Sequence, residues 1–120
     1  MAQHNELGSV GEEAAVNFLL QHNHVLLERN YRFGKAEVDI ISRDGRDIVF
    51  TEVKTRSTNA FGYPEEAVDK KKRRLLKQAA EEYLYQHKLD AGMRFDIIAI
   101  SMLNGEPQIH YIKDAFFYEE

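Results

Sequence analysis

The chain of 120 residues contains no cysteine, which excludes disulfide bonds and thiolate metal sites. No apolar run approaches the roughly 18 residues that a membrane-spanning helix needs, and the N-terminus lacks the basic start and apolar stretch of an export signal. The hydrophobic share of 43% and the charged share of 30% are typical of an ordinary soluble protein. We therefore expect a single domain over residues 1–120, located in the cytoplasm and without a membrane partner.

A general excess of positive charge is also missing. The net charge is -4 and the pI is about 5.7, which argues against a protein whose whole surface binds phosphate groups. However, the segment 54–77 holds eight basic and three acidic residues, so the rest of the chain carries a net charge of -9. Such segregation is compatible with a local anion-binding surface on an acidic body, and also with a role in solubility alone.

The spacing of apolar residues predicts two helices and five strands. The expected order is a helix at 7–21, strands at 25–33, 37–43 and 48–55, a helix from Pro64 to about His87, and strands at 95–101 and 108–112. A long helix between the third and fourth strands favours a crossover between parallel strands. The expected fold class is therefore α/β, with a central mixed five-stranded sheet flanked by helices.

The third predicted strand is the most informative segment, because two ionisable residues interrupt an otherwise apolar run. Glu52 and Lys54 alternate with buried positions and share a face with Phe50. Asp39, in the preceding strand, lies opposite Phe50 if the hairpin loop has two residues and opposite Glu52 if it has four. In both cases Asp39, Glu52 and Lys54 share one face, whereas a three-residue loop would separate them unless a bulge restored the register.

This arrangement of charges predicts metal chemistry. Two carboxylates about 5 to 8 Å apart repel each other unless a positive charge lies between them, and Mg²⁺ commonly takes one or two carboxylates plus water and phosphate oxygens. Asp39 and Glu52 are therefore candidate ligands for Mg²⁺ or Mn²⁺, and Lys54 is a candidate for orienting or deprotonating an attacking water. The alternative is a surface hairpin with a cross-strand Lys-Glu pair, because an acid followed by Glu-x-Lys is a weak pattern by itself.

The first predicted helix carries a further acid beside two glycines. Gly8 and Gly11 each cost about 1 kcal/mol in a helix relative to alanine, so we expect another backbone to approach closely there. Glu12 is either a third acidic group directed at the hairpin site or a first-turn acid that stabilises the helix N-terminus. His22 and His24 form a His-x-His pair with no third ligand nearby, and we expect both at the surface.

The second predicted helix has basic residues on two faces. Lys72 falls on the inner stripe, so it either extends outward at the helix end or reaches into a polar site near the acids, where it would contact phosphate. The apolar members of that stripe are Val68, Leu75, Ala79 and Tyr83. The opposite face fits a solvated surface, formed by Lys70, Arg73, Arg74 and Lys77.

Several motifs together resemble those of a known family. They are Gly8-x-x-Gly11-Glu12, Asn30-Tyr31-Arg32, Glu37-x-Asp39, Phe50-x-Glu52-Val53-Lys54-x-Arg56, Phe61-Gly62, the Lys71 to Leu75 segment and Arg94-Phe95-Asp96. Over nearly its whole length the chain resembles the bacterial family UPF0102, also called YraN. That family is similar to the archaeal Holliday junction resolvases and to the wider PD-(D/E)xK, restriction-endonuclease-like nucleases.

The resemblance implies a restriction-endonuclease-like domain that hydrolyses phosphodiester bonds in DNA, including branched or single-stranded DNA, and works as a homodimer. Asp39, Glu52 and Glu12 would hold Mg²⁺ or Mn²⁺, and Lys54 would act on the attacking water. The candidate contacts to nucleic acid are Arg56, Lys71, Lys72 and Arg74. Two other hypotheses remain: a nucleic-acid-binding accessory protein without catalysis, and a protein-interaction module that uses the aromatic tail Phe116-Phe117-Tyr118.

Overall fold

The protein is described here by a computed structural model covering residues 6–56, 68–103 and 106–116. Its elements are α1 (Glu6–Gln21), β1 (Val25–Phe33), β2 (Ala36–Asp44), β3 (Asp47–Arg56), α2 (Lys70–Gln86), β4 (Gly92–Leu103) and β5 (Glu106–Phe116). The predicted order of helix, three strands, helix and two strands is confirmed. None of the described helices is both long and apolar enough to cross a membrane.

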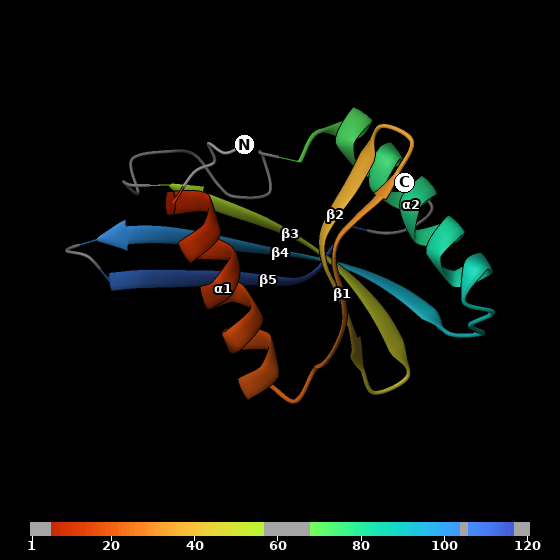
Figure 1. Cartoon of the computed structure of the whole chain (residues 1–120), viewed down its shortest axis with the longest axis horizontal. Helices are drawn as coiled ribbons and strands as arrows, with labels where there is room; N and C mark the ends of the chain where they lie inside the picture. The colour runs from red at the N-terminus through yellow and green to blue at the C-terminus, as the bar shows by residue number, and fades with distance from the viewer. Residues whose placement is uncertain (1–5, 57–67, 104–105, 117–120) are drawn as a thin grey trace.

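The five strands form one mixed sheet in the order β1-β2-β3-β4-β5. β3 and β4 pair in parallel, with Phe50 beside Phe95 and Glu52 beside Ile97, whereas the other neighbouring strands are antiparallel. A parallel pair needs a crossover connection, and α2 supplies it (Figure 1). The expected architecture, a central mixed sheet flanked by helices, is therefore the observed one.

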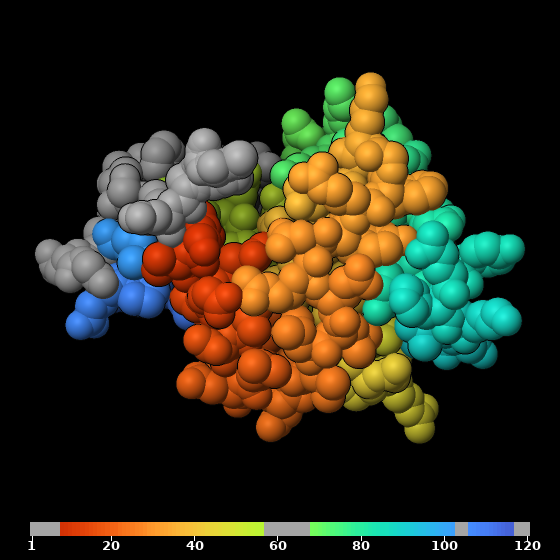
Figure 2. Space-filling view, in the orientation of Figure 1, coloured from red at the N-terminus to blue at the C-terminus, as the bar shows by residue number. Residues whose placement is uncertain are grey.

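The two helices cover opposite faces of the sheet. Ile40 of β2 packs in one core cluster with Ala15 and Leu19 of α1, whereas the next residue, Ile41, packs in the other cluster with Leu76 of α2. In Figure 1, α1 lies across β3, β4 and β5, while α2 lies beside the ends of β1 and β2 that rise away from the other strands. Figure 2 shows α1 and the β1–β2 hairpin as a continuous surface bordered on one side by α2.

Gly11 allows α1 to approach β3 closely, as its low helix propensity suggested. Gly11 is buried, and a Cβ atom built on it would lie 2.0 Å from Thr55 Oγ1 and 2.8 Å from Thr55 Cγ2. Such distances are far below ordinary contact, so only a hydrogen atom fits at this position. The close approach fixes the beginning of α1, and with it Glu12, against the sheet.

We expect Gly11→Ala to lower the free energy of unfolding by about 1 to 3 kcal/mol, because the added methyl group overpacks the contact with Thr55. This loss should exceed the gain of about 1 kcal/mol that alanine brings to a helix. Urea denaturation measures the difference. Adding Thr55→Ala should recover part of the loss, and wild-type stability of the single variant would contradict the close approach.

α2 begins later than predicted. Asp69 caps the helix, because its Oδ1 accepts a hydrogen bond from Lys72 N at 2.9 Å, and the helical residues start at Lys70. Residues 64–67 lie outside the described residues, but Val68 is not helical, so the prediction of one continuous helix from Pro64 is wrong. The N-cap aspartate is the local feature that sets the true start.

The predicted solvated basic face of α2 is only partly correct. Lys70 and Arg74 are exposed, but Arg73 is half-buried and Lys77 is buried. The Arg73 guanidinium lies 5.0 Å from the centre of the Phe116 ring at the end of β5. For Arg73, the prediction failed because the aromatic ring beside it comes from a distant part of the chain.

Candidate metal centre

The β2–β3 hairpin brings Asp39 and Glu52 to one side of the sheet. The ladder between these strands ends with the pair Ile40–Thr51, and one further step of the same register would set Asp39 opposite Glu52. The first residues of β2, before this point, pair with β1 alone.

Asp44 pairs with Asp47, so the turn holds two residues, Gly45 and Arg46, and lies one residue later than a turn centred on Asp44-Gly45. The prediction that a two-residue loop sets Asp39 opposite Phe50 is therefore wrong, and the register is the one that was expected for four loop residues.

The Asp39 side chain accepts a hydrogen bond from β3 just beyond the last backbone pair of the two strands. Val53 N donates a hydrogen bond to Asp39 Oδ2 at 2.8 Å. The carboxylate is therefore fixed at the point where β2 and β3 separate, and no described residue donates a hydrogen bond to its other oxygen. A backbone N–H group holds a carboxylate in one orientation, because the strand fixes the direction of the N–H bond, whereas a side-chain donor can rotate.

Lys72 reaches from α2 to the second acid of the hairpin. Its Nζ lies 2.7 Å from Glu52 Oε2, and the Glu52 side chain is only 5% exposed. Of the two alternatives for Lys72, the polar site near the acids is thus the observed one. The crossover helix supplies a cation to the acidic residues of the hairpin.

The pKa values of Asp39 and Lys72 are shifted by burial and by the neighbouring charges. Burial raises the pKa of Asp39 to about 7, and the negative charges of Glu52 and Glu12 add to the rise, while the hydrogen bond from Val53 and the charge of Lys72 oppose it. Burial alone would lower the pKa of Lys72, but the hydrogen bond and charge of Glu52 outweigh burial and raise it. The raised pKa of Asp39 favours its protonated form, and the raised pKa of Lys72 keeps its ammonium group charged.

Asp39 should make the metal-free protein less stable as pH rises. Its pKa is about 7 in the folded chain against an ordinary value of 3.8, so the folded state keeps the proton to higher pH. Asp39 therefore adds as much as about 4 kcal/mol to the free energy of unfolding below about pH 4, and this stabilisation is lost progressively as the pH rises to about 7. Urea denaturation at about pH 5 and about pH 8 should show that the free energy of unfolding of Asp39→Asn, relative to that of wild type, is higher at pH 8 than at pH 5. A difference that is the same at both pH values would contradict this.

Glu12 is held by β1 in the described structure. Its Oε1 accepts hydrogen bonds from Arg29 Nη2 at 2.9 Å and from Asn30 Nδ2 at 3.4 Å, and Arg29 also binds Glu13 at 2.9 Å. The charge of Glu12 nevertheless contributes to the raised pKa of Asp39. Glu12 as a metal ligand therefore stays a prediction.

The remaining predicted site residues lie on β3 and α2. Lys54 is half-buried, follows Glu52 by two residues and makes no ion pair with the part of the chain that is described. Arg56 is half-buried and has a partner, whereas Lys71 and Arg74 are exposed. Their role in binding nucleic acid stays a prediction.

The donor set fits a hydrated divalent cation better than a fully protein-ligated one. Among the described residues, no three acidic or histidine side chains are close enough to hold one metal ion. Mg²⁺ does not need three, because it usually keeps several waters and is bound by one or two carboxylates plus substrate phosphates. Within the described residues, no group donates a hydrogen bond to Asp39 Oδ1 or Glu52 Oε1. Neither oxygen is among the fully buried polar atoms that lack a partner, so each keeps some access to solvent. Both carboxylates therefore have an oxygen to offer.

A buried polar group at the other end of β2 was missed in the sequence. His24 was expected at the surface but is buried; its Nδ1 lies 2.8 Å from Ser42 Oγ and its Nε2 lies 3.5 Å from Asp44. The reason is Asn23, whose φ of 70° ends α1 in a left-handed conformation and turns His24 beneath the helix. The prediction for the exposed His22 is confirmed.

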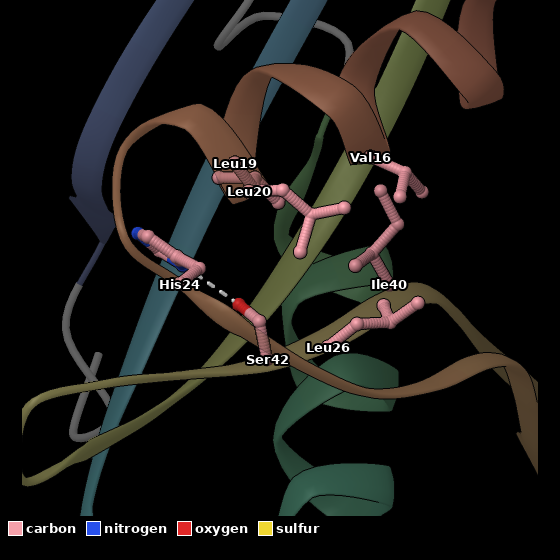
Figure 3. Close-up of a pocket in the computed structure, with 7 residues that line it drawn as sticks. All are labelled: Val16, Leu19, Leu20, His24, Leu26, Ile40 and Ser42. Atoms are coloured by element: carbon pink, nitrogen blue, oxygen red, sulfur yellow. Dashed lines mark hydrogen bonds between the residues drawn. The ribbon is translucent and has the colours of Figure 1, made fainter.

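This group does not form an accessible catalytic triad. Figure 3 shows His24 and Ser42 beside the apolar residues that pack between α1 and β2. Ser42 is only 1% exposed, so its hydroxyl cannot meet a substrate. Burial lowers the pKa of His24, which favours a neutral structural imidazole.

Arg94 and Asp96 extend the same network into β4. Arg94 Nε and Nη2 donate to the two Asp96 oxygens at 3.0 and 2.9 Å, and Nη1 donates to Asp44 at 2.9 Å. Tyr111 Oη and Asp114 N also donate to Asp96. The network joins β2, β4 and β5, so its evident role is structural.

Comparison with known proteins assigns the family. The model of the uncharacterised protein family UPF0102 matches residues 11–100. The chain belongs to this family. UPF0102 proteins of Christiangramia forsetii and Bacteroides thetaiotaomicron are 48% identical over 118 residues and 44% identical over 117 residues; these alignments cover 98% of this chain and 99% and 97% of the relatives. The family resemblance expected from the motifs is confirmed.

A more distant likeness comes from a solved structure of Pyrococcus furiosus SfsA in complex with Ca²⁺. It shares 16% sequence identity with this chain at a TM-score of 0.42. The alignment covers 89% of this chain but only 62% of the SfsA chain.

The motif residues of this UPF0102 protein thus fall into two separate groups. One holds the acids of α1, β2 and β3 together with Lys72, and the other is the network around Arg94. The second group satisfies its charges internally. In the first group both Asp39 and Glu52 keep an oxygen without a donor among the described residues, so it is the candidate functional site.

Proposed function

We propose that this UPF0102 protein is a Mg²⁺- or Mn²⁺-dependent endonuclease that hydrolyses phosphodiester bonds in DNA, including branched or single-stranded DNA. The observation that carries this proposal is the apposition of the Asp39 and Glu52 carboxylates where β2 leaves β3, close enough for the charge of Glu52 to raise the pKa of Asp39. Burying like charges side by side opposes folding. A site that binds a cation accounts for the pair better than packing does.

Each residue of the site would have a distinct task. Asp39 and Glu52 would supply the protein oxygens for the metal, and the Val53 N–H would keep Asp39 oriented. Lys54, on the same face as Glu52, would hold or deprotonate the attacking water. The metal, when bound, supplies Lewis-acid stabilisation of the charge that develops on the phosphate.

The DNA would lie against the beginning of α2 and the end of β3. The exposed Lys71 and Arg74, together with Arg56, would bind phosphate groups, which carry most of the affinity for DNA and little sequence preference. Dimer formation and a cytoplasmic location, expected from the resemblance and the composition, belong to the same proposal.

Cleavage of labelled DNA tests the proposal. The purified protein is incubated with a four-way junction, a flap and a single-stranded oligonucleotide in MgCl₂ or MnCl₂. We expect cleavage of at least one substrate with metal and none in EDTA. Intact DNA in all three cases with both metals would overturn the endonuclease activity.

A nucleic-acid-binding role without catalysis is the second candidate, and the Lys72–Glu52 ion pair favours it because it neutralises one of the two carboxylates. In that case the protein would bind DNA in a salt-dependent way that persists after Glu52→Gln and needs no metal. A protein-interaction role of the aromatic tail is less favoured. Phe116 is buried and stacks on Phe95 with 5.0 Å between ring centres, while residues 117 and 118 lie outside the described residues.

A further inference from the structure

Lys72 stands in a position that a bound cation would take. Its ammonium lies 2.7 Å from a Glu52 oxygen, and the charge of Asp39 also acts on it. The Lys72 backbone is itself fixed, because its N–H donates to the N-cap residue Asp69 at 2.9 Å. A rigid helical turn thus delivers a positive charge to a buried carboxylate.

The neighbouring lysines of α2 behave differently. Lys70 and Lys71 are exposed, as expected for side chains whose only task is to bind phosphate or keep the protein soluble. The Lys72 side chain is 39% exposed and turns toward Glu52, whose side chain is 5% exposed. Lys72 therefore belongs to the acidic site in the metal-free protein.

We propose that Lys72 is a tethered cation that occupies Glu52 in the metal-free protein and leaves it when a divalent cation and DNA phosphate bind. The inference rests on the proposed function, because it takes Glu52 as a metal ligand. Glu52 Oε1 is open to a metal while Oε2 binds the ammonium group, but two cations on one carboxylate repel each other, so binding of the metal favours release of Lys72.

Two consequences follow for binding. Lys72 lowers the metal affinity of the site while DNA is absent, because the ammonium group neutralises Glu52 and repels the metal. Once released, the same ammonium group becomes available to a phosphate group of the DNA. Metal and DNA are therefore taken up with positive coupling, and each raises the affinity for the other.

Calorimetric titration of MnCl₂ without DNA into wild type, Lys72→Met and Lys70→Met tests this inference. Lys70→Met removes the same charge from an exposed lysine of the same helix and so controls for net charge. We expect Mn²⁺ to bind about five- to tenfold more tightly to Lys72→Met, and we expect its affinity for Lys70→Met to lie within about twofold of wild type. Lys72→Gln should behave like Lys72→Met, and urea denaturation verifies that every variant is folded.

A second measurement uses a labelled DNA duplex in EDTA, followed by fluorescence anisotropy. The affinity of Lys72→Met for the duplex should lie within about twofold of wild type, because Glu52 already engages Lys72 when metal is absent.

Unchanged Mn²⁺ affinity in Lys72→Met would overturn the inference while leaving the endonuclease proposal intact, provided that wild type binds Mn²⁺ and Asp39→Ala does not. If wild type and both Lys72 variants fail to bind Mn²⁺ with and without the duplex, both proposals are wrong.

Discussion

Asp39→Asn and Glu52→Gln should each reduce DNA cleavage by at least about a thousandfold, while the protein stays folded. Each substitution keeps the shape of the side chain and removes the negative charge that would hold the metal. The asparagine carbonyl can still accept the hydrogen bond from Val53 N, so the end of the hairpin keeps its position. Initial rates on a labelled junction at saturating Mg²⁺ measure the effect.

Asp47→Asn is the matched control for this prediction. It makes the same chemical change at the turn end of the same hairpin, where the Asp47 side chain is 45% exposed. It should cut at nearly the wild-type rate. Urea denaturation of all the variants separates lost chemistry from lost folding. Wild-type cleavage by both Asp39→Asn and Glu52→Gln would mean that the hydrolysis does not use these carboxylates.

Arg94→Met should lower the free energy of unfolding by about 3 to 5 kcal/mol. The substitution leaves the Asp96 carboxylate, whose side chain is 0% exposed, without its bidentate partner. Removing one member of a buried ion pair is strongly destabilising, because the other charge stays buried without compensation. A loss of this size is a large share of the roughly 5 to 15 kcal/mol that stabilises a domain, and urea denaturation measures it.

Arg32→Met provides the comparison at the surface. The Arg32 side chain is 77% exposed and lies 3.7 Å from Glu37, so its loss should change stability by less than about 1 kcal/mol. Adding Asp96→Asn to Arg94→Met should recover part of the stability by removing the uncompensated charge. Equal effects of the two arginine substitutions would show that the network around Arg94 does not stabilise the fold.

The order of elements could be predicted because it depends on local periodicity. Alternation of apolar residues located β1 at Val25–Phe33, as observed, and helical spacing located α1 to within one residue. The start and the faces of α2 depend on contacts that local periodicity does not contain. Phe116, more than forty residues beyond Arg73 in the chain, covers part of the helix face that was expected to be solvated.

The candidate site could be predicted in part for the same reason. The shared face of Asp39 and Glu52 could be predicted from the parity of the hairpin. The close packing at Gly11 could be predicted because a glycine is otherwise unfavourable in a helix. The partner of Lys72 could be stated only as one of two alternatives, because it depends on how α2 crosses the sheet.

The network around Arg94 had a local indication that was not used. Arg94 and Asp96 alternate in an apolar strand, just as Glu52 and Lys54 do, so they share a face and can pair. His24 had no comparable indication. Its burial follows from the left-handed conformation of Asn23, which sequence spacing does not reveal.

The central claim is that Asp39 and Glu52 hold one divalent cation between them. Mn²⁺ tests it directly, because this paramagnetic ion broadens the NMR signals of nearby amide groups in ¹⁵N-labelled protein. The account predicts that the amide of Val53 and those flanking Asp39 disappear first, while those of His24 and Gly92, which lie beside Asp44 and Asp47 at the other end of the hairpin, persist. Broadening centred instead on Asp44 and Asp47, or a pattern unchanged in Asp39→Ala, would contradict it.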